Sequence, residues 1–210
     1  MSVEAPEMST FLYKLFSNVY YQQTIPSYDW NQISVTEAKQ CLLKSFYQRK
    51  LGRKLFDPKI VVLSFGRLIH TALQDQLIEH GYYPEYETTF EFGNVTLYSH
   101  ADALHPEHVL EIKTISRKPH QILTHHQPQI NAYCIINKRK LGYVAYIHKP
   151  SGNIYSFKWK PQHKMWEWLL MRAIRLSEHL RKNVPPKPEP SWLCRYCEYI
   201  DLCPKPKVKK

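Results

Sequence analysis

The sequence predicts an α/β (α+β mixed) fold, in which strand hairpins build one sheet and helices flank it. Two β-like runs, 95–104 and 108–115, surround a short break in which Pro106 suits a tight turn. A second hairpin is expected over 142–159. Helical patterns precede, separate and follow these hairpins, and 210 residues suffice for one sizeable core.

The composition points to a polyanionic partner. The formal net charge of +11 and the isoelectric point near 9.4 favour nucleic acid first and an acidic membrane surface second. The sequence shows no secretory signal, no run of roughly 20 apolar residues and no P-loop motif, so we expect a soluble cytoplasmic protein that is not a P-loop motor. Its five cysteines are then better interpreted as metal ligands or core residues than as disulfides.

The N-terminal part should contain an arm and then a helix. Residues 1–33 are polar and aromatic with no clear period, which indicates a loosely packed arm and leaves a role in subunit contacts open. A helix should follow, because Ser34 and Glu37 form a capping box. We expect it to carry Cys41 and to end before Gly52, a favourable residue after a helix.

A second helix is expected from about residue 64 to 81. It places Gly66 and His70 on one face, where the glycine leaves room beside the histidine. The next run, 82–92, alternates as a half-buried strand. Its polar face consists of Glu85, Glu87, Thr89 and Glu91. Of these, Glu87 could approach a site on the next hairpin, although an exposed strand position is the simpler interpretation.

The hairpin that follows carries paired charges. If its turn is centred on Pro106-Glu107, paired residue numbers sum to 213, so Asp102 lies opposite Glu111. Lys113 shares this face, whereas Ile112 points the other way. Two facing carboxylates repel unless a cation separates them, and oxygen ligands suit Mg²⁺ or Mn²⁺. The alternative is a solvated strand face on which Lys113 only neutralises its neighbours.

Two further helices are expected after this hairpin. The first, about 121–137, places Gln129 and Tyr133 at i and i+4 on one face and carries Cys134, which we assign to the core. The second, 163–182, has an apolar stripe opposite a basic side. That basic side is either a solvated face or a nucleic-acid contact.

The C-terminal part carries a cysteine motif. The proline-rich segment 184–190 indicates a stiff connector, and 205–210 is a basic tail. Between them lies the spacing C-x₂-C-x₅-C, formed by Cys194, Cys197 and Cys203. Three thiolates are one short of a tetrahedral set for Zn²⁺ or an iron–sulfur cluster, and Cys41 is the natural fourth ligand. A zinc knuckle that uses Cys41 or a histidine is the alternative.

The order of these motifs resembles one family. Asp102, eight residues and then Glu111-Ile112-Lys113 resemble the core of the PD-(D/E)xK nuclease superfamily. Gly-x-x-x-His at His70 and Gln-x-x-x-Tyr at Gln129 are similar to its RecB-like branch. The arrangement of one early cysteine and three late ones resembles that of the branch members that hold a [4Fe–4S] cluster. In its length and its lack of a helicase, the chain is most similar to the CRISPR-associated RecB-like nucleases.

The resemblance implies a restriction-endonuclease-like core with a central mixed sheet flanked by helices, and a cysteine-clipped iron–sulfur region. It divides the chain into an arm (1–33), a nuclease core (34–183), a connector with the cysteine knuckle (184–204) and a tail (205–210). It implies these site residues: metal ligands His70, Asp102, Glu111 and the Ile112 carbonyl; catalytic Asp102, Glu111 and Lys113; substrate-orienting Gln129 and Tyr133; and cluster ligands Cys41, Cys194, Cys197 and Cys203.

By the same resemblance the activity would be a Mn²⁺- or Mg²⁺-dependent DNA exonuclease, 5′ to 3′ on single strands, with endonuclease activity open. It would act in CRISPR spacer acquisition beside integrase proteins, with the cluster in a structural role. Two other classes stay open. One is a nucleic-acid-binding module with a zinc knuckle and no chemistry. The other is a subunit of an adaptation or recombination complex that is active only with a partner.

Overall fold

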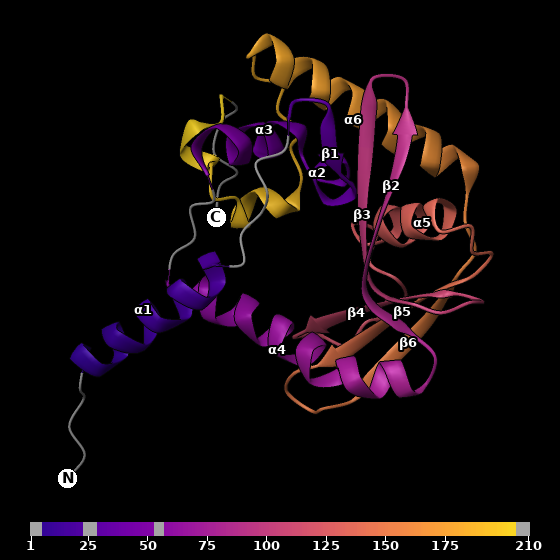
Figure 1. The fold of residues 1–210 in the computed structure, drawn as a ribbon. Helices are drawn as coiled ribbons and strands as arrows, with labels where there is room; N and C mark the ends of the chain where they lie inside the picture. The colour runs from indigo at the N-terminus through magenta and orange to yellow at the C-terminus, as the bar shows by residue number, and fades with distance from the viewer. Residues whose placement is uncertain (1–5, 23–28, 53–56, 205–210) are drawn as a thin grey trace.

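The computed structural model describes residues 6–22, 29–52 and 57–204 (Figure 1). The strands are β1 (Gln32–Ser34), β2 (Tyr83–Phe92), β3 (Val95–Leu104), β4 (Val109–Ile115), β5 (Gly142–His148) and β6 (Ile154–Trp159). The helices are α1 (Pro6–Gln22), α2 (Val35–Lys39), α3 (Leu42–Leu51), α4 (Asp57–Glu79), α5 (Gln127–Ile136) and α6 (His163–Lys182), followed by the 3₁₀ turns η1 (Trp192–Tyr196) and η2 (Ile200–Leu202). Within these ranges, none of the helices combines the length and apolarity that a membrane span requires.

The strands form one mixed sheet, as predicted. Its order is β1-β3-β4-β5-β6, and β2 pairs with the other edge of β3. β1 runs parallel to β3 and β4 runs parallel to β5, whereas the remaining pairs are antiparallel. The connection from β4 to β5 passes through α5, which makes a β-α-β unit. Helices flank the sheet, and in Figure 1 α6 crosses behind β2 and β3.

On the edge of β3 that does not pair with β2, the strands β1 and β4 leave a gap between them. β1 pairs with Thr96–Tyr98, and β4 pairs only with Ala103 and Leu104. The pairs Ala103–Leu110 and Leu104–Val109 confirm the predicted register, because their numbers sum to 213. Beyond them the strands separate, and residues 99–102 have no ladder partner on this edge in the described structure. Asp102 therefore lies at a fork in the sheet.

Several helix boundaries differ from the predicted ones. The Ser34 capping box is present, but the predicted helix divides at Gln40 into α2 and α3, and Cys41 is the residue before α3. α4 begins seven residues earlier than predicted and α5 begins six residues later, whereas α6 agrees at both ends. The corner at Gln40 is fixed by tertiary contacts from α6, which local sequence patterns do not encode.

The N-terminal region is more ordered than a loosely packed arm. Pro6–Gln22 form the 17-residue helix α1, which packs along α4. Figure 1 shows α1 projecting from the body, whereas α4 continues from α1 to the sheet, where it contacts β2 and β4. Gln32–Ser34 belong to the sheet, and Ile33 is completely buried there. The predicted basic tail, 205–210, lies outside the described residues.

The core lies between the sheet and the helices α2, α5 and α6. α6 buries most of its predicted apolar stripe: Trp166, Leu169, Leu170, Ala173 and Leu180. α5 packs so closely on β5 that a Cβ on Gly142 would lie 2.7 Å from both Cys134 Sγ and Ile130 Cγ1. Cys134 is fully buried, as predicted for a core residue. The contact of Ile130 and Cys134 with Gly142 therefore sets the distance between α5 and the sheet.

The two ends of the described chain meet around α3. Figure 1 shows α3 beside the C-terminal segment, and side-chain contacts join them. The Lys44 ammonium lies 3.0 Å from the Glu198 carboxylate. The rings of Tyr47 and Tyr199 are 5.8 Å apart, and the Tyr199 hydroxyl donates to the Gly52 carbonyl. The cysteine motif is therefore packed against the helix that follows Cys41.

Candidate metal centre and cysteine cavity

The predicted ligands from α4 and the hairpin lie together at the fork of the sheet. His70 Nδ1 is 3.6 Å from the Asp102 carboxylate, and His70 Nε2 is 3.2 Å from the Ile112 carbonyl oxygen. The Ile112 amide donates a 2.6 Å hydrogen bond to the other Asp102 oxygen. Where β3 and β4 separate, the Asp102 side chain thus accepts the hydrogen bond that the Ile112 amide would otherwise donate to a strand backbone. This arrangement gathers three of the four predicted oxygen and nitrogen donors.

Glu85 is a further acidic residue of this group, and the sequence analysis did not single it out. The pairs Pro84–Ala103 and Tyr86–Ala101 place Glu85 opposite Asp102 on β3. Its carboxylate lies 3.4 Å from His70 Nδ1, and the potential ligand atoms of His70, Glu85 and Asp102 fall within 4.8 Å of one another. The same register could be counted from the turn at Gly93-Asn94, where Phe92 pairs with Val95.

Hydrogen bonds set the charges around Glu85. Burial alone would raise its pKa, but hydrogen bonds from His100 and His70 outweigh burial and lower the Glu85 pKa to about 2. The same carboxylate raises the pKa values of His70 and His100. Glu85 is therefore ionised throughout the physiological range. The predicted candidate Glu87 is 79 % exposed and lies only near His100, so it is outside the group.

Glu111 and Lys113 form a buried ion pair beside this group. Glu111 is 1 % exposed, and its carboxylate contacts the Lys113 ammonium, which lies 3.9 Å from Asp102. Burial and then the Asp102 charge raise the pKa of Glu111 to about 7. Burial would lower the Lys113 pKa, but Glu111 and Asp102 outweigh it and raise the pKa.

The donor set fits a hard divalent cation. Glu111 Oε1 contacts the Lys113 ammonium, whereas Oε2, which is also buried, has no hydrogen-bond partner among the residues that the structure describes. A buried carboxylate oxygen with unused acceptor sites is costly, and a metal ion beside it would fill them. Carboxylates, a carbonyl and one imidazole are the ligands that Mg²⁺ and Mn²⁺ accept. The residues at the fork therefore suit the predicted metal.

Gln129 and Tyr133 lie at the open edge of β3. Both are buried on α5, and the Gln129 amide donates a 3.0 Å hydrogen bond to the Tyr133 hydroxyl. This hydroxyl also bonds the backbone of His100, inside the gap between β1 and β4. The Gln129 side-chain oxygen accepts a hydrogen bond from Lys39 of α2, a residue that the sequence analysis did not single out. Burial, followed by the Lys113 charge, lowers the pKa of Lys39 to about 8.

A neutral histidine supports the loop before α5. The Tyr146 hydroxyl accepts a 3.0 Å hydrogen bond from the Leu123 amide and lies 2.9 Å from His126 Nδ1. An uncharged imidazole with its lone pair on Nδ1 can accept the proton of this hydroxyl. Burial, followed by the charges of His125, Lys39 and Lys113, lowers the pKa of His126 to about 2.

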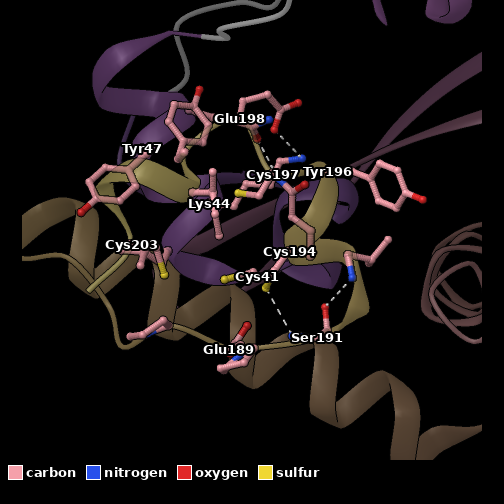
Figure 2. Close-up of a pocket in the computed structure, with 18 of the residues that line it drawn as sticks. Cys41, Lys44, Tyr47, Glu189, Ser191, Cys194, Tyr196, Cys197, Glu198 and Cys203 are labelled. Atoms are coloured by element: carbon pink, nitrogen blue, oxygen red, sulfur yellow. Dashed lines mark hydrogen bonds and ion pairs between the residues drawn. The ribbon is translucent and has the colours of Figure 1, made fainter. Parts of the chain in front are cut away.

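The four cysteines predicted to bind a cluster line one cavity. Cys41, Cys194, Cys197 and Cys203 surround a cavity of about 980 Å³, and Figure 2 shows them gathered from both ends of the chain. All four are free thiols. The Ser191 amide donates a 3.3 Å hydrogen bond to Cys194 Sγ, a contact that suits a thiolate ligand. Four thiols around one space are the donor set of a [4Fe–4S] cluster or of zinc.

The wall of this cavity is a charged clamp. Arg172 of α6 donates to the carbonyls of Ala38 (2.7 Å) and Gln40 (2.6 Å) and forms a bidentate ion pair with Glu189. Glu189 in turn accepts a 3.1 Å hydrogen bond from the Leu42 amide. The clamp thus joins α6, the connector and the corner between α2 and α3. It fixes Cys41 from both sides.

A second group of potential ligands lies at the turn between β3 and β4. It consists of His105, Glu107 and His108. His105 Nδ1 accepts a hydrogen bond from the Glu107 amide, and His108 Nε2 bonds the Tyr82 hydroxyl at 2.8 Å. The lone pair of His105 Nδ1 is thus occupied by this hydrogen bond and is not free to bind a metal ion in this geometry. The turn carries a structural hydrogen-bond network.

Comparison with solved structures assigns the fold. The chain is similar to the crystal structure of SSO0001, with a TM-score of 0.72 and 22 % identity over 94 % of this chain and 96 % of that one. It is also similar to a putative exonuclease from Eubacterium rectale, with a TM-score of 0.54 and 12 % identity over 85 % and 91 % of the two chains. No family model and no curated protein matches the sequence.

A third similar structure is LHK-Exo in complex with dAMP, the alkaline exonuclease from Laribacter hongkongensis. The TM-score is 0.51 and the identity 10 %, over 73 % of this chain and 89 % of that one. Similarity at these identities establishes a shared fold. The predicted mixed α/β core, with a central sheet flanked by helices, is therefore confirmed.

Proposed function

We propose that the protein is a metal-dependent DNA nuclease that hydrolyses phosphodiester bonds at the fork of the sheet. The observation that carries this proposal is the joint placement of His70, Glu85 and Asp102 beside the buried Glu111–Lys113 pair. The buried Oε2 of Glu111 has no hydrogen-bond partner among the described residues and would accept a metal ion, and the lysine next to this carboxylate suits a reaction at a phosphate. The exonucleases that share the fold support the same reaction class.

Each residue has a separate task in this proposal. His70, Asp102, Glu111 and the Ile112 carbonyl would hold Mn²⁺ or Mg²⁺, and Glu85 would complete the set. A cation held there supplies Lewis-acid chemistry and an activated water. Lys113 would stabilise the negative charge that develops on a phosphate oxygen. Gln129 and Tyr133 hold the open edge of β3 and would orient the substrate.

The resemblance to RecB-like nucleases supplies the finer proposal. We infer that the substrate is single-stranded DNA, degraded from its 5′ end, and that the biological setting is CRISPR spacer acquisition beside integrase proteins. The net charge of +11 supports binding to a polyanion of any sequence. The CRISPR setting comes from the resemblance to the CRISPR-associated members of that branch alone.

For the cysteine cavity we propose a [4Fe–4S] cluster with a structural role. Phosphodiester hydrolysis involves no electron transfer, and the cavity joins the two ends of the chain. A zinc site is the competing occupant, since zinc accepts the same thiolates. Visible absorption of anaerobically purified protein separates the two, because a cluster gives a broad brown absorption band and zinc gives none.

The proposal is tested by incubating the metallated protein with a labelled oligonucleotide and Mn²⁺, with Asp102→Asn as the comparison. We expect cleavage by the wild type that EDTA abolishes, and none by the variant. DNA binding without any cleavage would instead favour a non-catalytic nucleic-acid-binding module. Cleavage that appears only when integrase proteins are added would favour a partner-dependent subunit.

A further inference from the structure

Lys39 lies inside the candidate nuclease site although it comes from a different part of the chain. Its ammonium donates to the Gln129 side-chain oxygen, and Gln129 bonds Tyr133. The charges of Lys113, Glu111 and Asp102 all act on it, so it stands close to the metal centre. Lys39 therefore reaches the centre from the end of α2, beside Gln129 of α5.

The charge of Lys39 is not balanced inside the described part of the protein. Lys113 is in ion-pair contact with Glu111, whereas Lys39 contacts only the neutral amide of Gln129. No carboxylate of the described residues lies in ion-pair contact with its ammonium. A half-buried ammonium that lacks an anion is unfavourable. The geometry thus provides a place for an external anion beside the metal centre.

The position of Lys39 is fixed from the cysteine side. It is the last residue of α2, and the carbonyls on either side of it, Ala38 and Gln40, both accept hydrogen bonds from Arg172. Arg172 is held in turn by Glu189 of the connector that leads to the cysteine knuckle. Cys41, which lines the cysteine cavity, follows two residues after Lys39. The clamp therefore links the cavity to the nuclease site.

We propose that Lys39 binds a non-bridging oxygen of a substrate phosphate next to the metal centre, and that the Arg172–Glu189 clamp holds it in place for this contact. The inference rests on the proposed nuclease function and adds a substrate-binding residue to it. A lysine ammonium is a common phosphate ligand that acts as a point charge. The contact strengthens phosphate binding only while the corner between α2 and α3 keeps its conformation.

The first test is kinetic. Lys39→Met is expected to lower kcat/KM by roughly 100-fold, the scale of losing one donor to a reacting phosphate, while Lys39→Arg restores part of it. Lys158→Met is the matched control, since it removes one exposed charge on β6 and should leave kcat/KM unchanged. Equal losses in the Lys39→Met and Lys158→Met variants would overturn the proposal, because they would show only a loss of overall charge.

The second test locates the contact on the substrate. Oligonucleotides that carry one neutral methylphosphonate linkage, moved stepwise along the strand, are cleaved by the wild type and by Lys39→Met. We expect one position where the neutral linkage slows the wild type and has no further effect on the variant, because the partner charge is already gone. If every linkage affects both proteins equally, Lys39 contacts no phosphate.

The third test addresses the clamp. Glu189→Gln removes the charge that holds Arg172, and we expect it to reproduce the altered linkage dependence of Lys39→Met at a weaker level. A purely structural role would lower the melting temperature and leave the linkage dependence like that of the wild type, which would overturn the positioning role. A metallated wild type that cleaves no substrate would refute the nuclease proposal itself, and is thereby distinguished from a failure of Lys39 alone.

Discussion

At the scale of single residues, Glu85 has the most unusual backbone of the site. Its φ of +48° is left-handed in the middle of a strand, where a residue with a side chain is strained. The conformation turns the carboxylate toward His70 and Asp102. Strain of this kind persists where the surrounding structure holds it, and functional sites are a common place for it.

Replacement of Glu85 should therefore weaken metal binding more than stability. We expect Glu85→Gln to lower the apparent Mn²⁺ affinity of cleavage by roughly 10- to 100-fold, with partial rescue at high Mn²⁺. The measurement is a Mn²⁺ titration of the cleavage rate. Glu87→Gln is the control, since Glu87 lies on the same strand face but is exposed. Identical titrations for the wild type and Glu85→Gln would exclude Glu85 from the metal centre.

His126 should make stability depend on pH. Its pKa of about 2 in the folded protein lies below the ordinary value near 6.5, so below pH 6.5 the unfolded chain binds a proton that the folded chain does not. This contribution is constant above pH 6.5, and stability is lost as the pH falls below it. The loss attributable to His126 amounts to about 1.4 kcal/mol per pH unit.

The matching variant is His126→Asn, which keeps an acceptor for the Tyr146 hydroxyl but does not titrate. Urea unfolding at several pH values between 4 and 8 should show that the free energy of unfolding falls less steeply for the variant on the acid side. Parallel curves for the two proteins would mean that His126 is protonated, or exposed, in the folded state.

The site residues differ in how far the sequence could reveal them. His70, Asp102, Glu111 and Lys113 stand in short motifs whose spacing reflects one helix face and one hairpin, and the structure brings them together. No sequence motif marks Lys39 as a site residue, because only its tertiary contact with Gln129 brings it to the site. Glu85 was predictable in principle, from the register that the turn at Gly93 imposes on β2 and β3.

At the scale of elements, the contact between α5 and β5 positions the residues that we propose to orient the substrate. Gly142 lets Ile130 and Cys134 approach the sheet, and the same helix carries Gln129 and Tyr133. Gly142→Ala would place a methyl group inside this contact. We expect it to lower the free energy of unfolding by about 1–3 kcal/mol, because neither neighbour is the end of a long flexible side chain.

Gly66→Ala is a matched substitution that should raise the free energy of unfolding. A Cβ on Gly66, in α4, would meet Thr114 Oγ1 only at 4.0 Å, so the space beside this glycine is open. Gly66→Ala should therefore stabilise the protein by about 1 kcal/mol through helix propensity. Thermal unfolding of the Gly142→Ala and Gly66→Ala variants measures both changes in stability. A stable Gly142→Ala protein would show that α5 can shift away from the sheet at little cost.

Elements were predictable where a local pattern repeats. The alternation in β3 and the apolar stripe of α6 located both with exact ends. α1 was missed because its aromatic residues follow no clear helical period, and it packs on α4 rather than into the main core. The break between α2 and α3 was missed because Arg172 imposes it from a distant helix.

At the scale of the whole molecule, the cysteine cavity joins the first and last parts of the described chain. A metal ion or cluster bound there should then contribute to global stability, since the four cysteines are brought together only by folding. We expect Cys197→Ser to lose the bound group and to lower the melting temperature. Cys134→Ala, which alters a buried cysteine outside the cavity, should retain it.

Metal analysis by mass spectrometry and a thermal melt of each variant check this prediction. Full metal content in Cys197→Ser would remove Cys197 from the ligand set. An unchanged melting temperature after loss of the group would show that the packing of α3 against the C-terminal segment suffices by itself.

The central claim is that the fork of the sheet is a nuclease centre, and cleavage of end-labelled single-stranded DNA with Mn²⁺ tests it most directly. We predict that wild-type protein shortens the strand from its 5′ end and that Lys113→Met, with an unchanged circular dichroism spectrum, does not cleave. Equal cleavage by both proteins would contradict the account, because the activity would then lie elsewhere or come from a contaminant.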